Sequence, residues 1–148
     1  MVIKMRMYYI FNVKKDIAIL YQNDPKSLYK ILENLYYMHK EDVDYGFNLF
    51  KQLTTRIKVD ELNNLIYIKL HKDFIYSKTN DEHVINDLYH DEVSILKVRN
   101  SHLLLESNKN YSSFFKLLTI LNSHYFVCDF KEKDFFFMND IVKMIDVK

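Results

Sequence analysis

The sequence is poor in glycine, proline and cysteine, with one residue of each among 148, and it contains no tryptophan. Phosphate-binding loops of the Walker type and dinucleotide-binding loops need several glycines, because their backbone amides must approach a phosphate closely. The nucleophile elbow of many hydrolases needs two glycines around its serine. The single glycine, Gly46, therefore excludes all three kinds of catalytic site.

Charge of one sign and long hydrophobic runs are missing as well. The formal net charge is +1, so we expect no overall attraction to nucleic acid or to a membrane. The apolar stretch after the basic N-terminus ends at Phe11, too short for a signal-peptide core, and no run reaches the ~18 residues of a membrane span. The lone Cys128, inside an apolar strand, is typical of a buried thiol in a reducing compartment. We therefore expect a cytoplasmic protein that neither binds DNA directly nor attaches to a membrane.

Apolar side chains are what the sequence has in quantity. Hydrophobic residues make up 49% of the chain and aromatic residues 16%, which excludes disorder. A chain of this length buries roughly two thirds of the surface that it exposes when unfolded. We expect a single domain that spans residues 1–148.

The segment 92–138 has the clearest pattern: a β-hairpin, a helix and a second β-hairpin. Residues 93–98 alternate with a period near two, and 102–106 return after a turn. The helix at 112–122 is apolar on most of its circumference, so it must be covered on several sides. We expect it to be the most buried helix. Two aromatic-rich runs within 124–138, joined by a polar turn, form the second hairpin.

The N-terminal part predicts a strand at 7–13 followed by three helices, the first of them short. Asp24 before Pro25 predicts the start of the second helix, since an aspartate N-cap and a proline at the first helical position are typical of helix starts. The third helix begins at about Val43. Its predicted buried side chains are Phe47, Phe50 and Leu53.

The segment 58–91 has the weakest pattern. Asp60 can start a helix, and although alternate residues there also fit a strand, we predict the helix. Polar residues 77–82 predict a loop, and 83–89 predict one further helical turn. The tail from Ile141 is amphipathic and short. The predicted fold is α/β (α+β), a mixed and mostly antiparallel sheet of about five strands with helices packed on it.

Histidines and carboxylates are the first candidates for chemistry. Those at 81–83 and 90–92 lack the His-x-x-x-His or cysteine spacing of metal sites, so we interpret them as solvated loops and expect no cofactor. Asp129 and Asp134 flank a hairpin turn, where carboxylates usually cap the turn. As a catalytic pair with a histidine they would make the chain a small cytoplasmic enzyme, and this alternative stays open.

Twelve tyrosines are more than a core of this size can hold beside eleven phenylalanines, so several must reach the surface. Tyrosine is enriched at protein interfaces, and Tyr29, Tyr36 and Tyr37 are candidates. Lysines beside aromatic residues at 14–15 and 131–133 leave single-stranded nucleic-acid binding as another alternative. Acidic residues lie close to these lysines, which favours a protein-binding module.

Three blocks of sequence carry a family resemblance. They are Arg6-x-Tyr8-Tyr9 with the following Ala18 and Tyr21, then Leu28-Tyr29-x-Ile31-Leu32, and last Phe114-Phe115-x-x-Leu118 with the strand that ends in Asp129-Phe130. In order and spacing these blocks resemble the SirA family, the sporulation inhibitors of replication of low-GC Gram-positive bacteria. The resemblance covers nearly the whole chain except 58–91.

The resemblance implies a non-catalytic α/β protein that binds the N-terminal domain of the replication initiator DnaA and thereby inhibits initiation at the chromosomal origin. Apart from the resemblance, we expect a monomer without cofactors. The family's partner-binding positions fall here on Ile17 and Tyr21 in the first helix, and on Lys51 and Gln52 in a later one. Ile17 stands where the family has a phenylalanine.

Overall fold

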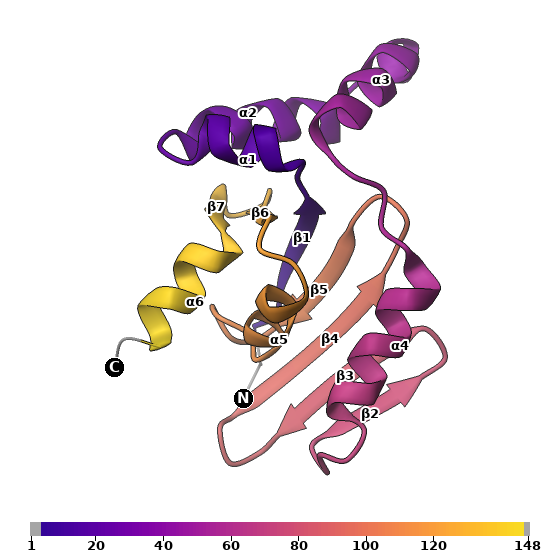
Figure 1. The fold of residues 1–148 in the computed structure, drawn as a ribbon, viewed down its shortest axis with the longest axis vertical. Coiled ribbons are helices and arrows are strands. Elements are labelled where there is room, and N and C mark those ends of the chain that lie inside the picture. The colour runs from indigo at the N-terminus through magenta and orange to yellow at the C-terminus, as the bar shows by residue number, and fades with distance from the viewer. Residues whose placement is uncertain (1–3, 147–148) are drawn as a thin grey trace.

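The computed structural model describes residues 4–146, which form a seven-stranded sheet with helices on both faces (Figure 1). The strands are β1 Arg6–Asn12, β2 Tyr76–Thr79, β3 Glu82–Asp87, β4 Glu92–Val98, β5 Leu103–Ser107, β6 Tyr125–Asp129 and β7 Asp134–Phe137. The helices are α1 Lys15–Tyr21, α2 Pro25–Tyr36, α3 Val43–Leu53, α4 Val59–Leu70, α5 Phe114–Leu121 and α6 Met138–Asp146, with a short 3-10 turn at Lys40–Asp42.

The order of strands across the sheet is β2-β3-β4-β5-β1-β6-β7, and every neighbouring pair is antiparallel. The α+β class predicted from the sequence is therefore confirmed, but the predicted five strands were too few. Strand β1 lies inside the sheet, where Ile10 pairs with Leu103 of β5 and with Val127 of β6. The N-terminal strand thus depends on segments from the far end of the chain.

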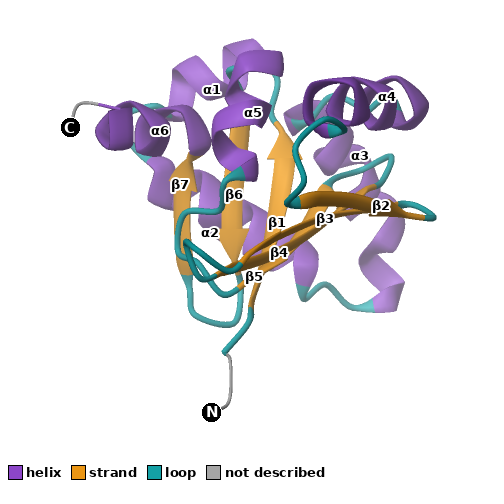
Figure 2. Cartoon of the chain, turned by 90° about the horizontal axis from the view of Figure 1, so that it is seen from below, coloured by secondary structure: helices purple, strands orange, loops and turns teal. Residues whose placement is uncertain are grey.

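Alternating residues of β1 serve two separate cores. Tyr8 and Ile10 belong to the cluster beneath α4, α5 and α6, whereas Phe11 and Val13 belong to the cluster beneath α1, α2 and α3. Figure 2 shows α4 along the β2–β3 side of the sheet and α6 along the β7 side. We call the first the α5-side core and the second the α1-side core.

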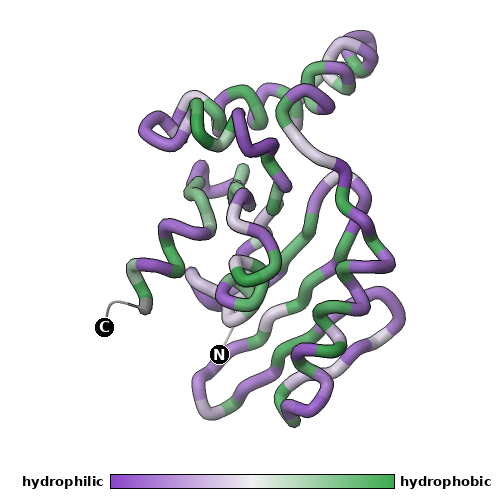
Figure 3. The backbone as a smooth tube through the Cα atoms, viewed as in Figure 1, coloured by the Kyte–Doolittle hydropathy of each residue, from purple (hydrophilic) through white to green (hydrophobic). Residues whose placement is uncertain are grey.

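Helix α5 is the centre of the α5-side core. Phe114, Phe115 and Leu118 are buried, as its apolar sequence predicts, and the helix is largely hydrophobic in Figure 3. Ile120 is nevertheless 71% exposed, so the helix is not covered on all sides.

The loop predicted at 77–82 and the helical turn predicted at 83–89 were wrong, because 77–87 belong to the hairpin β2–β3 and 88–89 to the turn that follows it. Asn80, in the turn, has φ 54°, a left-handed conformation that asparagine tolerates. Strand β2 lies at the edge of the sheet with three of its four residues exposed, so its polar sequence meets water. In β3 only alternate residues, His83 and Ile85, are buried.

Local signals elsewhere were reliable. Asp24 accepts a hydrogen bond from the backbone nitrogen of Ser27 at 3.3 Å, and Pro25 is the first residue of α2, as predicted. Helix α3 begins at Val43 as predicted, but Phe47 is 56% exposed and not buried. Tyr29, which the sequence suggested as a surface tyrosine, is buried against Phe130 and Phe135, while Tyr36 and Tyr37 are exposed.

Candidate protein-binding face

Helix α1 begins beside the point where α3 ends. The backbone nitrogen of Lys14 donates to the carbonyl of Leu53 at 3.0 Å, and the nitrogen of Thr55 donates to the carbonyl of Asn12 at 2.8 Å. These bonds join segments some forty residues apart in the sequence. They place the first turn of α1 and the last turn of α3 on one side of the molecule (Figure 1).

Helix α1 lies on the surface of the α1-side core and has no fully buried residue. Ile17 and Tyr21 are half-buried, each with part of its side chain packed against that core. Ile19 is 56% exposed and Leu20 is 68% exposed. The helix therefore offers a row of apolar side chains that the protein itself covers only in part.

The last turns of α3 add polar and cationic groups to this face. Lys51 and Gln52 are both exposed. The Lys51 Nζ lies 4.5 Å from the ring centroid of Phe47, one turn earlier, a distance at which the ring attracts the ammonium group. Lys15 at the start of α1 is also exposed, so cations are present on both helices of the face.

The four residues implied by the family resemblance thus fall on two helices whose ends are joined. Tyr21 lies at the far end of α1, roughly 9 Å along the helix axis from Lys15 at 1.5 Å per residue. A partner that contacts Tyr21 as well as Lys51 or Gln52 has to extend along α1 and across to α3.

Sequence reasoning missed Ile19 and Leu20 as candidate contact residues. The signal was present in the helix sequence, where four of seven side chains are large and apolar: Ile17, Ile19, Leu20 and Tyr21. A surface helix buries one stripe, so the apolar residues outside that stripe must face solvent or a partner.

The two carboxylates considered as a catalytic pair are held by an arginine and not by a histidine. Arg6 Nε donates to Asp129 at 2.9 Å, and a terminal nitrogen of Arg6 donates to Asp134 at 3.1 Å. The other terminal nitrogen donates to the Asn110 side chain at 2.9 Å. Asp129 also accepts a hydrogen bond from the backbone of Glu132, so it caps the β6–β7 turn as expected from the sequence. This arrangement ties β1 to the second hairpin.

The histidines of 81–92 belong to two different environments. His83 is fully buried, with Nδ1 at 2.8 Å from the Tyr76 hydroxyl and Nε2 at 2.7 Å from the Asn63 side-chain oxygen. His90 is exposed and lies 2.6 Å from Asp87. Among the residues that the structure describes, no three histidine, cysteine or acidic side chains are grouped as metal ligands.

The sequence model of the family described as "Sporulation inhibitor of replication protein SirA" matches residues 6–142. The chain belongs to the SirA family. The match includes the segment 58–91, where the sequence alone showed little resemblance, and it includes all of α1 and α3. No curated protein matches the chain.

The name of the family describes a sporulation inhibitor of replication, which is a regulatory protein of replication. None of the helices within residues 4–146 has the length and apolarity needed to cross a membrane.

Proposed function

We propose that this chain inhibits replication initiation without catalysis, by binding the N-terminal domain of DnaA through the face formed by α1 and the end of α3. Ile17 and Tyr21 supply apolar contacts, and Lys51 and Gln52 supply polar contacts at the edge. A single observation carries the proposal: α1 exposes the apolar side chains Ile19 and Leu20 beside the half-buried Tyr21. An apolar centre with a polar rim is the usual anatomy of a protein interface.

Tyr21 is proposed as the anchor of this interface. A buried interface tyrosine can carry about 2 kcal/mol or more of binding free energy, which corresponds to roughly thirtyfold or more in affinity. Because part of the ring packs on the α1-side core, removal of the whole side chain costs some folding stability too. Leu20, 68% exposed, permits a test with little such cost.

The test measures the affinity of wild type, Tyr21→Ala and Leu20→Asp for the isolated N-terminal domain of DnaA from the same host, by isothermal titration calorimetry. We expect at least thirtyfold weaker binding for Tyr21→Ala and at least tenfold for Leu20→Asp, with the melting temperature of Leu20→Asp unchanged. Tyr89→Ala is the matched control, because Tyr89 is 91% exposed in the β3–β4 turn, away from α1. Wild-type protein without affinity for DnaA would refute the partner, and unaltered binding by both α1 variants would refute the face.

A further inference from the structure

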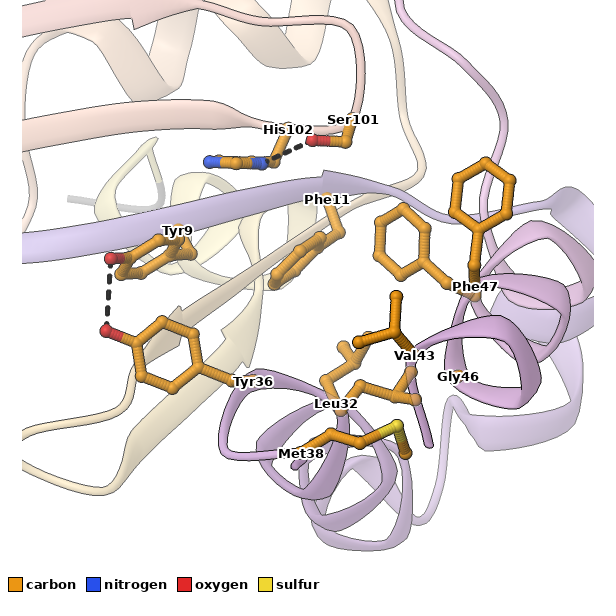
Figure 4. Close-up of a pocket in the computed structure, with 12 residues that line it drawn as sticks. Tyr9, Phe11, Leu32, Tyr36, Met38, Val43, Gly46, Phe47, Ser101 and His102 are labelled. Atoms are coloured by element: carbon orange, nitrogen blue, oxygen red, sulfur yellow. Dashed lines mark hydrogen bonds between the residues drawn. The ribbon is translucent and has the colours of Figure 1, made fainter. Parts of the chain in front are cut away.

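A cavity of about 500 Å³ opens between α2, α3 and the middle of the sheet (Figure 4). One wall is formed by Tyr9 and Phe11 of β1, and the opposite walls come from α2 and α3. The remaining lining residues are Leu32, Leu35, Tyr36, Met38, Val43, Gly46, Phe47, Phe50, Ser101 and His102. The cavity lies between α3 and the sheet, and it adjoins the end of α3, because the ring of Phe47 in its wall contacts Lys51.

The apolar stripe of α3 explains why the cavity stays open. Leu53 is buried and Phe50 is half-buried, but Phe47 is 56% and Val43 53% exposed. The apolar side chains of α3 are therefore more exposed toward the start of the helix, where α3 projects beyond the sheet (Figure 1). At Gly46 an added Cβ would lie 2.3 Å from the Met38 sulfur, so the helix approaches the end of α2 closely at this one point.

Aromatic rings belong to half of the lining residues, and among the side chains that the structure describes no lysine, arginine, aspartate or glutamate is part of the lining. Tyr9, Phe11, Tyr36, Phe47, Phe50 and His102 bring rings from β1, α2, α3 and the β4–β5 turn to one space. A cationic ligand would find no carboxylate among these lining residues, and burial of its charge without a counter-ion is strongly unfavourable. A flat, uncharged ring system can instead stack on, or pack edge-to-face against, the rings already present.

A few polar groups lie among these rings. The hydroxyl oxygens of Tyr9 and Tyr36 are 3.2 Å apart, and only one of their two protons is used between them. The Ser101 hydroxyl and His102 Nδ1 are 2.7 Å apart, which leaves Nε2 of the same ring for another partner. Burial and the nearby Arg99 lower the pKa of His102, so the imidazole is neutral at pH 7.

We propose that this cavity binds an uncharged, planar aromatic small molecule that carries one or two hydrogen-bonding groups. Its volume is within the 300–1,000 Å³ typical of small-molecule sites, and a mostly apolar lining with a few polar groups is the usual composition of such sites. The ligand would cover the exposed parts of Tyr36, Val43 and Phe47. The inference does not depend on the proposed partner, because the isolated protein suffices to test it.

The test uses N-phenyl-1-naphthylamine, an uncharged aromatic probe whose fluorescence rises in apolar sites, titrated against the full chain. We expect saturable binding of one probe per chain. Phe47→Glu places a carboxylate in the cavity wall and should weaken binding at least tenfold. Tyr45→Glu is the matched control, since Tyr45 is on the same helix, is 70% exposed and does not line the cavity, and it should change the affinity less than twofold. Should Phe47→Glu lose helical circular dichroism, Val43→Glu takes its place.

The outcomes separate the possible occupants. Displacement of the probe by 2-naphthol at lower concentration than by 1-octanol supports an aromatic ligand, whereas the reverse order overturns that class. Absence of saturable binding, or equal weakening by Phe47→Glu and Tyr45→Glu, overturns the site. A dimer in analytical ultracentrifugation that Phe47→Glu dissociates would assign the cavity to a second copy of the chain and overturn the ligand proposal.

Discussion

Glu92 is a buried carboxylate that its sequence context did not reveal. It is 4% exposed at the start of β4, and its oxygens accept hydrogen bonds from the hydroxyls of Ser94, Ser112 and Ser113 and from the backbone nitrogen of Ser113. Since Ser113 precedes the first residue of α5, the carboxylate occupies the position of a helix cap. Its negative charge there is stabilised by the positive end of the helix dipole. The side chain of Glu92 thus connects the hairpin β4–β5 to helix α5.

Glu92→Ala should therefore destabilise the protein by about 2–4 kcal/mol, because it leaves several buried donors without an acceptor. Urea unfolding followed by circular dichroism measures this loss. Glu106→Ala on the neighbouring β5 is the control, since Glu106 is half-buried and lies in the register opposite Ile95. Equal losses for the two variants would show that the hydrogen-bond network contributes nothing beyond ordinary packing.

His83 should make folding stability sensitive to mild acid. Burial, together with the charge of Lys78, lowers its pKa to about 4 in the folded protein, against an ordinary value of 6.5. Between these two values the unfolded chain binds more protons than the folded chain, so the free energy of unfolding falls as the pH is lowered from 6.5 toward 4. At pH 7 the contribution is fully present.

We expect His83→Phe to remove about 2–2.5 kcal/mol of the pH dependence of unfolding between pH 7 and 4.5, because each unit of pKa difference corresponds to about 1.4 kcal/mol. Urea unfolding at several pH values gives the slopes. Burial and the charge of Arg99 also lower the pKa of His102. Because His102 is present in both proteins, its contribution to the pH dependence cancels when the two slopes are compared. Identical slopes would contradict the prediction.

At the scale of elements, α5 offers a direct comparison of buried and exposed positions on one helix. Leu118 is fully buried in the α5-side core, so Leu118→Ala should cost about 2–5 kcal/mol through lost transfer free energy and the remaining cavity. Ile120→Ala, at a position 71% exposed, should change stability by less than about 0.5 kcal/mol. Thermal and urea unfolding measure both, and a loss below about 1 kcal/mol for Leu118→Ala would show that α5 is peripheral.

Elements whose signals are local were predictable from the sequence. Asp24 with Pro25 predicted the start of α2, and the alternation of residues 93–98 predicted strand β4. Strand β2 was missed because an edge strand has no buried neighbour on its outer side, so its polar residues carry no alternation. Periodicity identified the apolar stripe of α3, but not that the sheet ends beneath it, and for this reason Phe47 was wrongly expected to be buried.

The candidate binding face was predictable only in part. The family resemblance pointed to Ile17, Tyr21, Lys51 and Gln52, and it remains the reason for proposing them. The backbone bonds between Lys14 and Leu53 that bring the two helix ends together depend on long-range pairing, which no local pattern contains. The same holds for the exposure of Leu20, since only the packed core determines which side of a short helix is covered.

At the scale of the whole molecule, Cys128 reports on global opening. Its thiol is buried in the α1-side core, and burial raises its pKa well above the ordinary value. Reaction with 5,5′-dithiobis(2-nitrobenzoic acid) should therefore be undetectable on the timescale of minutes in native buffer and complete within seconds in concentrated urea.

The control for Cys128 is Ser101→Cys in a Cys128→Ser background. Ser101 is exposed in the β4–β5 turn, so its replacement should react at once under native conditions. Fast native reaction of Cys128 itself would show that the α1-side core opens without global unfolding.

The position of β1 also has a consequence for synthesis of the protein. Arg6 bonds to Asp129, 123 residues later, and Phe11 pairs with Phe126, so the first strand to leave the ribosome waits for its partners until almost the whole chain has been made. The hairpins β2–β3 and β4–β5 can form on the nascent chain, but the apolar strand β1 and the underside of α1 and α2 cannot yet be covered. A nascent chain of this kind exposes its N-terminal third to chaperones and proteases until translation ends, and its abundance in the cell then depends on how quickly β1 is inserted between β5 and β6.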